Sequence, residues 1–314
     1  MKLDSRENQP FLRRLGNDLL KHADAYILVI PVIIIYILFS YKPMYGIIIA
    51  FKDFSPGAGI WGSKWADSFG FQHFIDFFDS YYFGRVLKNT IVISLSSIIF
   101  GFPAPIIFAL MLNELKNLRF KKVVQTISYM PHFISMIVVA SLINFFVSDT
   151  GFITSIFMAF GGEKVSMLTV PQYFVPIYVI SGIWQELGWG AIIYLSALAG
   201  IDQELYEAAK IDGANRWKQT LYVTLPGISG TVIIMLLLRI GNIMNVGYEK
   251  IILLYNAGIY ETADVISTFV YRKGLLEYQW SYSAAVGIFN SVINFVIVVI
   301  FNKISRKMTD ISLW

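Results

Sequence analysis

The sequence predicts an all-α membrane protein with six transmembrane helices, and three observations lead to this fold class. First, 56% of the 314 residues are hydrophobic and only 15% are charged, whereas about a quarter of the residues in a soluble domain are charged. Second, apolar stretches recur along the whole chain, and about 20 apolar residues suffice to cross a bilayer. Third, Lys and Arg are dense in some connecting segments and sparse in others, as the two sides of a membrane require.

Six apolar stretches are long enough to span. They are residues 26–50, 87–112, 123–147, 173–198, 224–245 and 282–302. The bilayer core offers no hydrogen-bonding partner, so each span must satisfy its own backbone as a helix. Prolines in or near the spans should start or bend these helices. They are Pro31, Pro103, Pro105, Pro131 and Pro176.

The basic residues assign the sides of the membrane. Lys and Arg are roughly three times denser in one set of connecting segments than in the other, and the dense side faces the cytoplasm. The dense segments are 1–24, 113–122, 200–221 and 303–314, and the sparse ones are 52–85, 149–171 and 246–280. We therefore expect a cytoplasmic segment 1–25, a six-span domain 26–302 and a cytoplasmic tail 303–314.

The first outer segment, 52–85, is rich in aromatic residues. Examples are Trp61, Trp65, Phe77 and Tyr81. One interpretation is an interfacial belt, because Trp and Tyr gather at the level of the lipid headgroups. The other is a docking surface for an external partner, or rings that stack on sugars.

The composition excludes several kinds of site. There is no cysteine, so disulfides, thiolate catalysis and Cys-ligated metal centres are ruled out. His22, His73 and His132 show no metal-ligand spacing. Neither a G-x-x-x-x-G-K-[ST] phosphate loop nor a G-x-S-x-G nucleophile pattern occurs. The net charge of +4 reflects membrane topology, so we expect no bound metal or cofactor and no nucleic-acid partner.

The cytoplasmic segment 202–226 carries strong helix signals. Asp202 is a suitable N-cap for a short helix over 203–211, and Gly213 lies where a helix ends in a left-handed residue. A second helical stretch should begin at about Asn215, and Pro226 should lie in the first turn of the fifth span. The local chemistry alone fits either a connector between two spans or a docking element.

The spacing within this segment resembles a known motif. Glu207, Ala208 and Ala209 are followed after three residues by Gly213, and after nine more by Val223-Thr224-Leu225-Pro226. This pattern resembles the EAA loop of permease subunits in bacterial binding-protein-dependent ABC importers, with Val223 where Ile is usual. The resemblance implies a cytoplasmic coupling helix between the fourth and fifth spans that docks on a separate ATPase. The coupling residues would be Glu207, Ala208, Ala209, Asp212, Gly213, Leu225 and Pro226.

Three other stretches resemble the carbohydrate branch of these permeases, in particular the lipoprotein/polysaccharide permease proteins. They are residues 120–135, 184–190 (WQELGWG) and 243–262. The resemblance implies a multi-pass protein of the bacterial cytoplasmic membrane within a type I importer. Its partners would be a second, related but different permease chain, two ATPase subunits that bind the ATP and Mg²⁺, and an extracellular solute-binding lipoprotein.

Polar side chains within the spans suggest a solute path. An ionised side chain at the middle of a membrane costs about 2.5–3.5 kcal/mol, so such groups tend to mark cavities or helix contacts. The candidates are Trp184, Glu186, Trp189, Arg239, Asn242 and Asn245. Glu186 could instead pack against another helix, or Arg239 could pair with it.

The sequence therefore favours a non-enzymatic permease subunit that forms the path for an oligosaccharide in an ATP-driven importer. One alternative keeps the architecture and changes the cargo to a non-sugar solute. A second alternative is a secondary transporter driven by an ion gradient, and a more remote one is a membrane enzyme.

Overall fold

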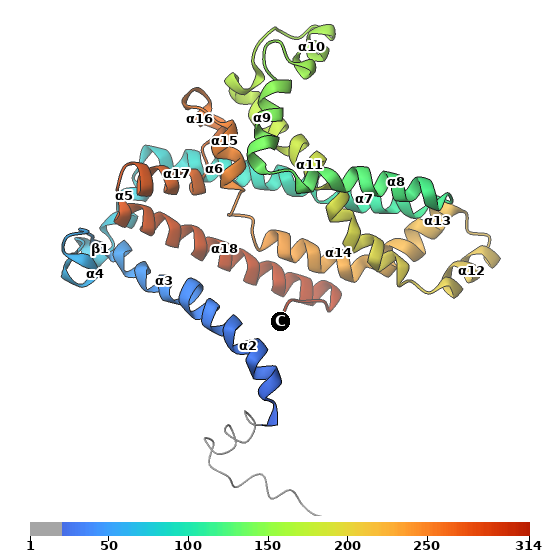
Figure 1. The fold of residues 1–314 in the computed structure, drawn as a ribbon, viewed down its shortest axis with the longest axis horizontal. Helices are drawn as coiled ribbons and strands as arrows, with labels where there is room; N and C mark the ends of the chain where they lie inside the picture. The colour runs from blue at the N-terminus through green and yellow to red at the C-terminus, as the bar shows by residue number, and fades with distance from the viewer. Residues whose placement is uncertain (1–20) are drawn as a thin grey trace, which may run out of the picture.

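The computed structural model describes residues 21–314 and is built almost entirely of helices (Figure 1). In this part of the chain the strands are β1 (Lys52–Asp53) and β2 (Lys64–Trp65), which pair antiparallel as a small hairpin. The predicted all-α class is confirmed.

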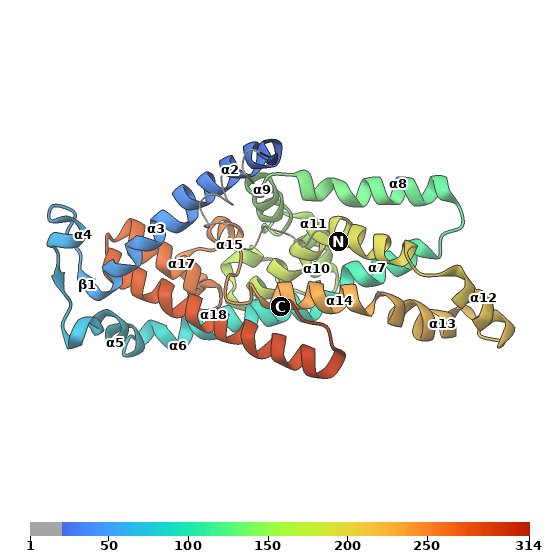
Figure 2. The same cartoon turned by 90° about the horizontal axis from the view of Figure 1, so that it is seen from below.

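The first apolar stretch forms one long helix that leaves the rest of the molecule (Figures 1 and 2). Its parts are α2 (Ala23–Tyr36), the π-helical turn η1 (Ile37–Tyr41), α3 (Lys42–Met44) and the 3₁₀ segment η2 (Tyr45–Phe51). No residue of α2 is buried. The far end, η2, packs on α18 (Trp280–Thr309) and so joins this helix to the body.

Three more helices are long and apolar enough to cross a membrane. The first joins α6 (Tyr81–Ser96), the π-helical turn η4 (Ser97–Gly101) and α7 (Pro103–Asn113). The second joins α13 (Arg216–Gln219), the π-helical turn η7 (Thr220–Thr224) and α14 (Leu225–Ile240). The third is α18.

The third predicted span is not a single straight helix. α8 (Leu118–Tyr129) and the 3₁₀ turn η5 (Met130–Phe133) meet α9 (Met136–Phe146) at an angle of 100°. Pro131 stands at the start of η5, and the backbone is extended at Ile134 and Ser135. The expectation that Pro131 bends or starts a helix is confirmed, but the bend is sharper than proline alone causes.

The fourth predicted span is α11 (Pro171–Ala199), a helix of 29 residues. The polar pair Gln185 and Glu186 lies in its middle, and α11 is not among the helices apolar enough to cross on composition alone. By length and composition, residues 21–314 hold four such helices, or five if α8 and α9 count as one bent span.

The fifth span differs from its prediction at both ends. It begins at Arg216 and ends at Ile240, so Pro226 lies well inside a continuous helix and not in its first turn. Asn242 and Asn245 lie in a non-helical turn after α14 and not on its outer half. The early start follows from the Asn215 cap, which accepts the N–H of Lys218.

Short helices fill the remaining connections. They are α4 (Gly59–Gly62), α5 (Gln72–Phe78), α10 (Phe152–Ala159), α12 (Gln203–Ile211), α15 (Tyr248–Leu254), α16 (Tyr260–Ala263) and α17 (Ile266–Tyr271).

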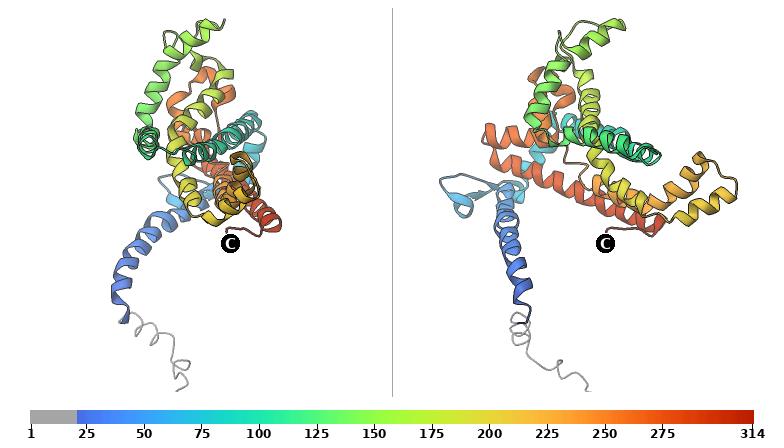
Figure 3. Two further views of the ribbon diagram at one scale, coloured as in Figure 1. Left: turned by 90° about the vertical axis from the view of Figure 1, so that its right-hand side faces the viewer. Right: turned by 45° about the vertical axis from the view of Figure 1, so that its right-hand side comes forward.

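α11 lies at the centre of the packing. It runs along α7 and also contacts α8, α14 and α16. One core lies where α9, α11 and α15 meet, and another joins α7, α11 and α14. A third, largely aromatic core holds Phe77 of α5 and Phe269 of α17 against α18. α18 therefore runs from the hairpin end of the molecule toward α14 and ends near the C-terminus (Figure 3).

Candidate coupling and translocation sites

α12 and α13 form an arm that projects from one end of the molecule (Figures 1 and 2). Asp202 caps α12 by accepting the N–H of Glu204 at 3.0 Å. Asn215 caps α13 by accepting the N–H of Lys218 at 2.9 Å. The helix over 203–211 and the second helix after Asn215 are confirmed.

The turn between the two helices depends on Gly213, whose φ is +76°. Its N–H donates to the carbonyl of Lys210 at 3.0 Å, and the N–H of Ala214 donates to that of Ala209 at 2.8 Å. This pair of hydrogen bonds closes a helix around a left-handed residue. A side chain at that φ costs about 1–2 kcal/mol, which explains glycine at this position.

The arm presents an exposed surface. Glu207, Ala208 and Asp212 are exposed, and Ala209 is half-buried. Three large apolar side chains are also uncovered: Leu205 is 54%, Ile211 87% and Trp217 73% exposed. Leu225 and Pro226 lie on α14 and not on the arm. Clustered exposed apolar groups usually mark an interaction surface.

Two polar contacts hold the arm to the body. The hydroxyls of Tyr206 on α12 and Thr224 on η7 lie 3.0 Å apart. Arg216 Nη1 donates to Glu114 Oε2, just beyond α7, at 3.0 Å. Because both partners of this ion pair are exposed, it adds at most about 1 kcal/mol of stability. It does orient the arm relative to the α7–α8 connection.

The turn after α14 is unwound, and neighbouring side chains satisfy its backbone. Ser94 donates to the carbonyl of Ile243, and Asn294 donates to that of Gly241. The Asn294 carbonyl oxygen accepts the N–H of Met244 at 3.2 Å. Non-helical backbone at membrane depth is tolerated only where protein or a cavity meets its hydrogen-bonding needs.

A cavity of about 290 Å³ lies beside this turn. Arg239, Asn242 and Asn245 line it together with Ser97 and Tyr178. The structure therefore brings together these three residues, which the sequence named from their polarity alone.

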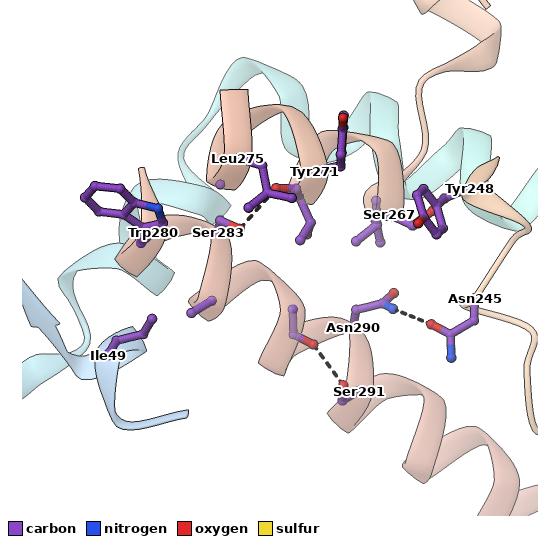
Figure 4. A pocket seen from close by; sticks show the side chains of 15 residues that line it. Ile49, Asn245, Tyr248, Ser267, Tyr271, Leu275, Trp280, Ser283, Asn290 and Ser291 are labelled. Atoms are coloured by element: carbon purple, nitrogen blue, oxygen red, sulfur yellow. Dashed lines mark hydrogen bonds between the residues drawn. The ribbon is translucent and has the colours of Figure 1, made fainter. Parts of the chain in front are cut away.

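A second cavity, of about 640 Å³, lies between α17, α18 and the same turn (Figure 4). Its lining combines aromatic rings with small polar groups: Tyr248, Tyr271, Trp280, Ser267, Ser291, Asn245 and Asn290. Asn290 donates to the side-chain oxygen of Asn245 at 3.1 Å. The Oδ1 atom of Asn290 is buried and accepts no hydrogen bond from the residues described.

Trp184, Glu186 and Trp189 do not line either cavity. Both carboxylate oxygens of Glu186 accept from His132 Nδ1, at 3.2 and 3.1 Å. The suggested Glu186–Arg239 pair is therefore wrong, because His132 is the partner of Glu186 and Arg239 lies on a cavity wall. Sequence reasoning missed His132, since 54 residues separate it from Glu186.

A buried lysine lies close to Glu186. Lys250 of α15 is 5% exposed, and its Nζ donates to the carbonyl of Tyr178 at 3.0 Å. Burial lowers the pKa of the Lys250 ammonium to about 8, and the negative charge of Glu186 opposes this shift.

The outer aromatic segment is partly internal. Phe77 is 1% exposed and packs in the aromatic core with Phe269, whereas Trp61 and Tyr81 are 75% and 84% exposed. The buried Lys52 organises the hairpin by donating to the carbonyls of Ile60, Trp61 and Ser63. The two interpretations offered for this segment therefore apply only to its exposed rings.

A third cavity, of about 490 Å³, lies at this outer segment. Asp53, His73 and Asp76 line one side of it, and Trp280 and Tyr282 the other. Trp280 also lines the 640 Å³ cavity. Between residues 21 and 314, no three His, Asp or Glu side chains converge as metal ligands would.

Comparison with known proteins identifies the family. A family model of the binding-protein-dependent transport system inner membrane component matches residues 82–310. The chain belongs to this family. It is similar to the protein LplB of Bacillus subtilis (strain 168), with 42% identity over 92% of this chain and 90% of that protein. It is also similar to the polygalacturonan/rhamnogalacturonan transport system permease protein YteP of the same organism, with 41% identity over 95% of this chain and 92% of that one.

Solved structures of similar chains exist. A bacterial ABC transporter involved in the import of the acidic polysaccharide alginate contains a chain with 44% identity to this permease and a TM-score of 0.86. The similarity covers 94% of this permease and 99% of that chain. A second structure holds the bacterial alginate transporter in complex with an alginate pentasaccharide-bound periplasmic protein, with 43% identity and a TM-score of 0.86.

Family membership establishes the general role. The permease is an inner membrane component of a binding-protein-dependent transport system, and the ATPase of such a system is a separate subunit. The matched residues include the arm, the unwound turn and most of the lining of the two cavities beside it.

Proposed function

We propose that this permease forms the translocation path for an oligosaccharide in an ATP-driven importer of the bacterial cytoplasmic membrane. The observation that carries the proposal is the 44% identity and TM-score of 0.86, over 94% of the chain, to a subunit of the alginate importer. The transport system of YteP, which handles polygalacturonan and rhamnogalacturonan, supports a saccharide cargo.

The permease crosses the membrane six times in this proposal. α11 supplies one crossing, since 29 residues extend about 43 Å at 1.5 Å per residue, more than the roughly 30 Å of the hydrocarbon core. Of its central polar pair, Gln185 is buried and the exposed Glu186 has His132 as a partner. An even number of spans puts both termini on one side, and the dense Lys and Arg assign that side to the cytoplasm.

The arm couples the permease to its ATPase. α12 is the coupling helix, with Glu207, Ala208 and Asp212 on its exposed surface. Ala209 allows close approach, Gly213 sets the bend, and Leu225 and Pro226 fix the helix that carries the arm. ATP-driven movement of two ATPase subunits, which bind the ATP and Mg²⁺, reaches the spans through α13 and η7.

The cargo passes the unwound turn. Arg239, Asn242 and Asn245 face one cavity, and Asn245 also faces the aromatic cavity with Asn290. The buried, unpartnered Oδ1 atom of Asn290 suits a sugar hydroxyl, and the rings of Tyr248 and Trp280 suit the apolar faces of pyranoses. Trp184, Glu186 and Trp189 lie outside these cavities and do not belong to this path.

The remaining partners are a second permease subunit and an extracellular solute-binding lipoprotein. We infer that the second permease is a related but different chain. The cargo is released by the binding protein into the cavities when the ATPase subunits close, so transport follows alternating access between two states.

The test is ATP-dependent uptake by the complex purified from native membranes and placed in vesicles. The wild-type complex should transport oligosaccharide only when ATP is present on the side of the vesicle membrane that carries the ATPase subunits. Gly213→Pro and Glu207→Lys should lose the ATPase or its coupling. Uptake driven by an ion gradient without ATP would favour a secondary transporter. ATP-dependent uptake of a non-sugar solute, with no uptake of oligosaccharide, would favour an importer of non-sugar solutes.

A further inference from the structure

The bend between α8 and α9 is held by the WQELGWG segment of α11. Gly188 lies so close to α8 that a Cβ there would stand 2.2 Å from the carbonyl oxygen of Ser128. Backbone contact of this kind leaves no room for a side chain, so only glycine fits. α8 and α11 therefore touch directly, one turn before the bend.

Aromatic contacts continue along the same face. The ring of Trp189 stacks on that of His132, with centroids 4.4 Å apart and planes 3° from parallel. Phe133 meets Trp189 edge to face at 5.5 Å. Both partners of Trp189 belong to η5, the turn that immediately precedes the extended residues Ile134 and Ser135.

A hydrogen bond completes the contact. His132 Nδ1 donates to the carboxylate of Glu186 at 3.1 Å, in the plane of the imidazole, so the face of the ring stays available for stacking on the indole. Three residues of α11 thus contact three residues at the end of α8 and in η5. The residues of α11 are Gly188, Trp189 and Glu186, and their partners are Ser128, His132 and Phe133. We call this group the clamp.

The clamp is the principal attachment of α8. No residue of α8 is buried, and its neighbours in the fold are α11 and η5. Four residues before α8 begins, Glu114 pairs with Arg216 of the arm. α8 is therefore tied to the arm at one end and to α11 at the other.

We propose that the clamp makes α8 and α11 one rigid unit, and that α9, which packs on α15 and meets α11 in one core, changes its angle to this unit about Ile134 and Ser135 when the arm moves. Glu186 is then a positioning residue that acts through His132, and it does not bind cargo. This inference uses only the family role of the permease as a transporter and does not depend on a saccharide cargo.

The first test measures distances in the complete transporter. The chain has no cysteine, so pairs of introduced cysteines can carry spin labels at unique places. One pair joins α8 to α11 (Lys121→Cys with Ile180→Cys), and the other joins α9 to α11 (Ile137→Cys with Ile180→Cys). Between the nucleotide-free and ATP-bound states, the α8–α11 distance should stay constant while the α9–α11 distance changes. Any other pattern overturns the proposal.

The second test is a double-mutant cycle on uptake. Glu186→Gln and His132→Gln should each lower the maximal rate of ATP-driven uptake, by up to about fivefold as expected for loss of an exposed polar contact. The double variant should be no worse than either single one, because both act through one contact. The cargo concentration at half-maximal rate should stay unchanged.

Matched controls separate the explanations. Glu163→Gln removes an exposed carboxylate outside the clamp and should leave uptake as in wild type. Two results together would show that Glu186 binds cargo. Glu186→Gln would raise the cargo concentration at half-maximal rate, and the losses of uptake rate in Glu186→Gln and His132→Gln would add in the double variant. If wild-type uptake proves independent of ATP, the proposed function is wrong. The spin-label distances between α8, α9 and α11 would still test whether the clamp holds α8 and α11 together.

Discussion

Asp264 is a buried charge with several polar partners. It has no exposed surface, and its carboxylate accepts two hydrogen bonds from Arg272, at 3.1 and 2.6 Å. Arg85 of α6 approaches it at 3.4 Å, and Thr268 donates to it at 2.9 Å. The carboxylate therefore joins α6 to α17 and the turn that follows it.

Removing this charge should destabilise the protein. Asp264→Asn keeps the size of the side chain but leaves Arg272 and Arg85 without a counter-charge, which typically costs about 3–5 kcal/mol. We expect the melting temperature of the permease in lipid nanodiscs to fall clearly, as measured by tryptophan fluorescence. Glu277→Gln, which breaks the more exposed Lys273–Glu277 pair, should change it little. Equal shifts in the two variants would contradict the structural role of Asp264.

Three of the four π-helical turns that the structure describes end two residues before a proline. η1, η4 and η7 precede Pro43, Pro103 and Pro226. A proline within a helix lacks the N–H and its ring collides with the carbonyl four residues earlier. That earlier residue is the middle of the π turn in each case, and the wider turn moves the carbonyl away. The long helices thus pass their prolines without breaking.

Pro226 should consequently set the angle of the arm. In Pro226→Ala, η7 can relax to an α-helix, which rotates the arm relative to α14 by about 100°, the angle of one residue. Arg216 would then leave Glu114. A short thiol-reactive crosslinker between Glu114→Cys and Arg216→Cys measures this proximity in a chain that has no other cysteine. We expect the crosslinking yield to fall with Pro226→Ala and to persist with Pro43→Ala, and an undiminished yield in both would disprove the link.

Short-range signals explain what the sequence predicted well. The limits of α12 follow from the Asp202 cap and from Gly213, both within a few residues of the helix. The apolar stretches located the long helices for the same reason. Pro131 predicted a bend near η5, but the sharpness of that bend and the early end of α14 were not predicted, because they depend on partners far away in the chain, such as Glu186, Ser94 and Asn294.

The candidate path was predicted only in part, for a similar reason. Arg239, Asn242 and Asn245 stood out as polar residues in an apolar stretch, and the fold gathers them. Tyr248 and Trp280 were overlooked because they belong to a segment taken as an outer loop. Asn290 did carry a usable signal, since it is an amide within the apolar stretch 282–302. Glu186 carried the same signal and serves another contact, so polarity alone does not identify a path.

The three cavities form a series through the permease. Trp280 lines both the outer cavity and the aromatic one, and Asn245 lines both the aromatic cavity and the one beside Arg239. The outer cavity carries Asp53 and Asp76, whereas the innermost carries Arg239. Charge along the series therefore changes from negative to positive.

The first helix gives the last prediction, because no residue of α2 is buried among the residues that the structure describes. Its 18-residue apolar window has a mean hydropathy of 2.3 and no buried residue, and α2 extends away from the body in Figures 1 and 3. η2 joins this helix to the body, chiefly at α18. A single apolar helix held at one end is poorly fixed, so we expect one face of α2 to pack against the second permease subunit.

Cysteine scanning of α2 in the Cys-free chain tests this packing. Single cysteines at Ile30, Val32, Ile34 and neighbouring positions would be given an apolar photo-crosslinker in native membranes. Crosslinks to the second permease should recur every three to four residues, since one face of a helix repeats at that interval. A control cysteine at Phe152, exposed on α10, has no such helix neighbour to reach. Crosslinks to lipid at every position of α2, with none to a permease, would mean that α2 is surrounded by lipid.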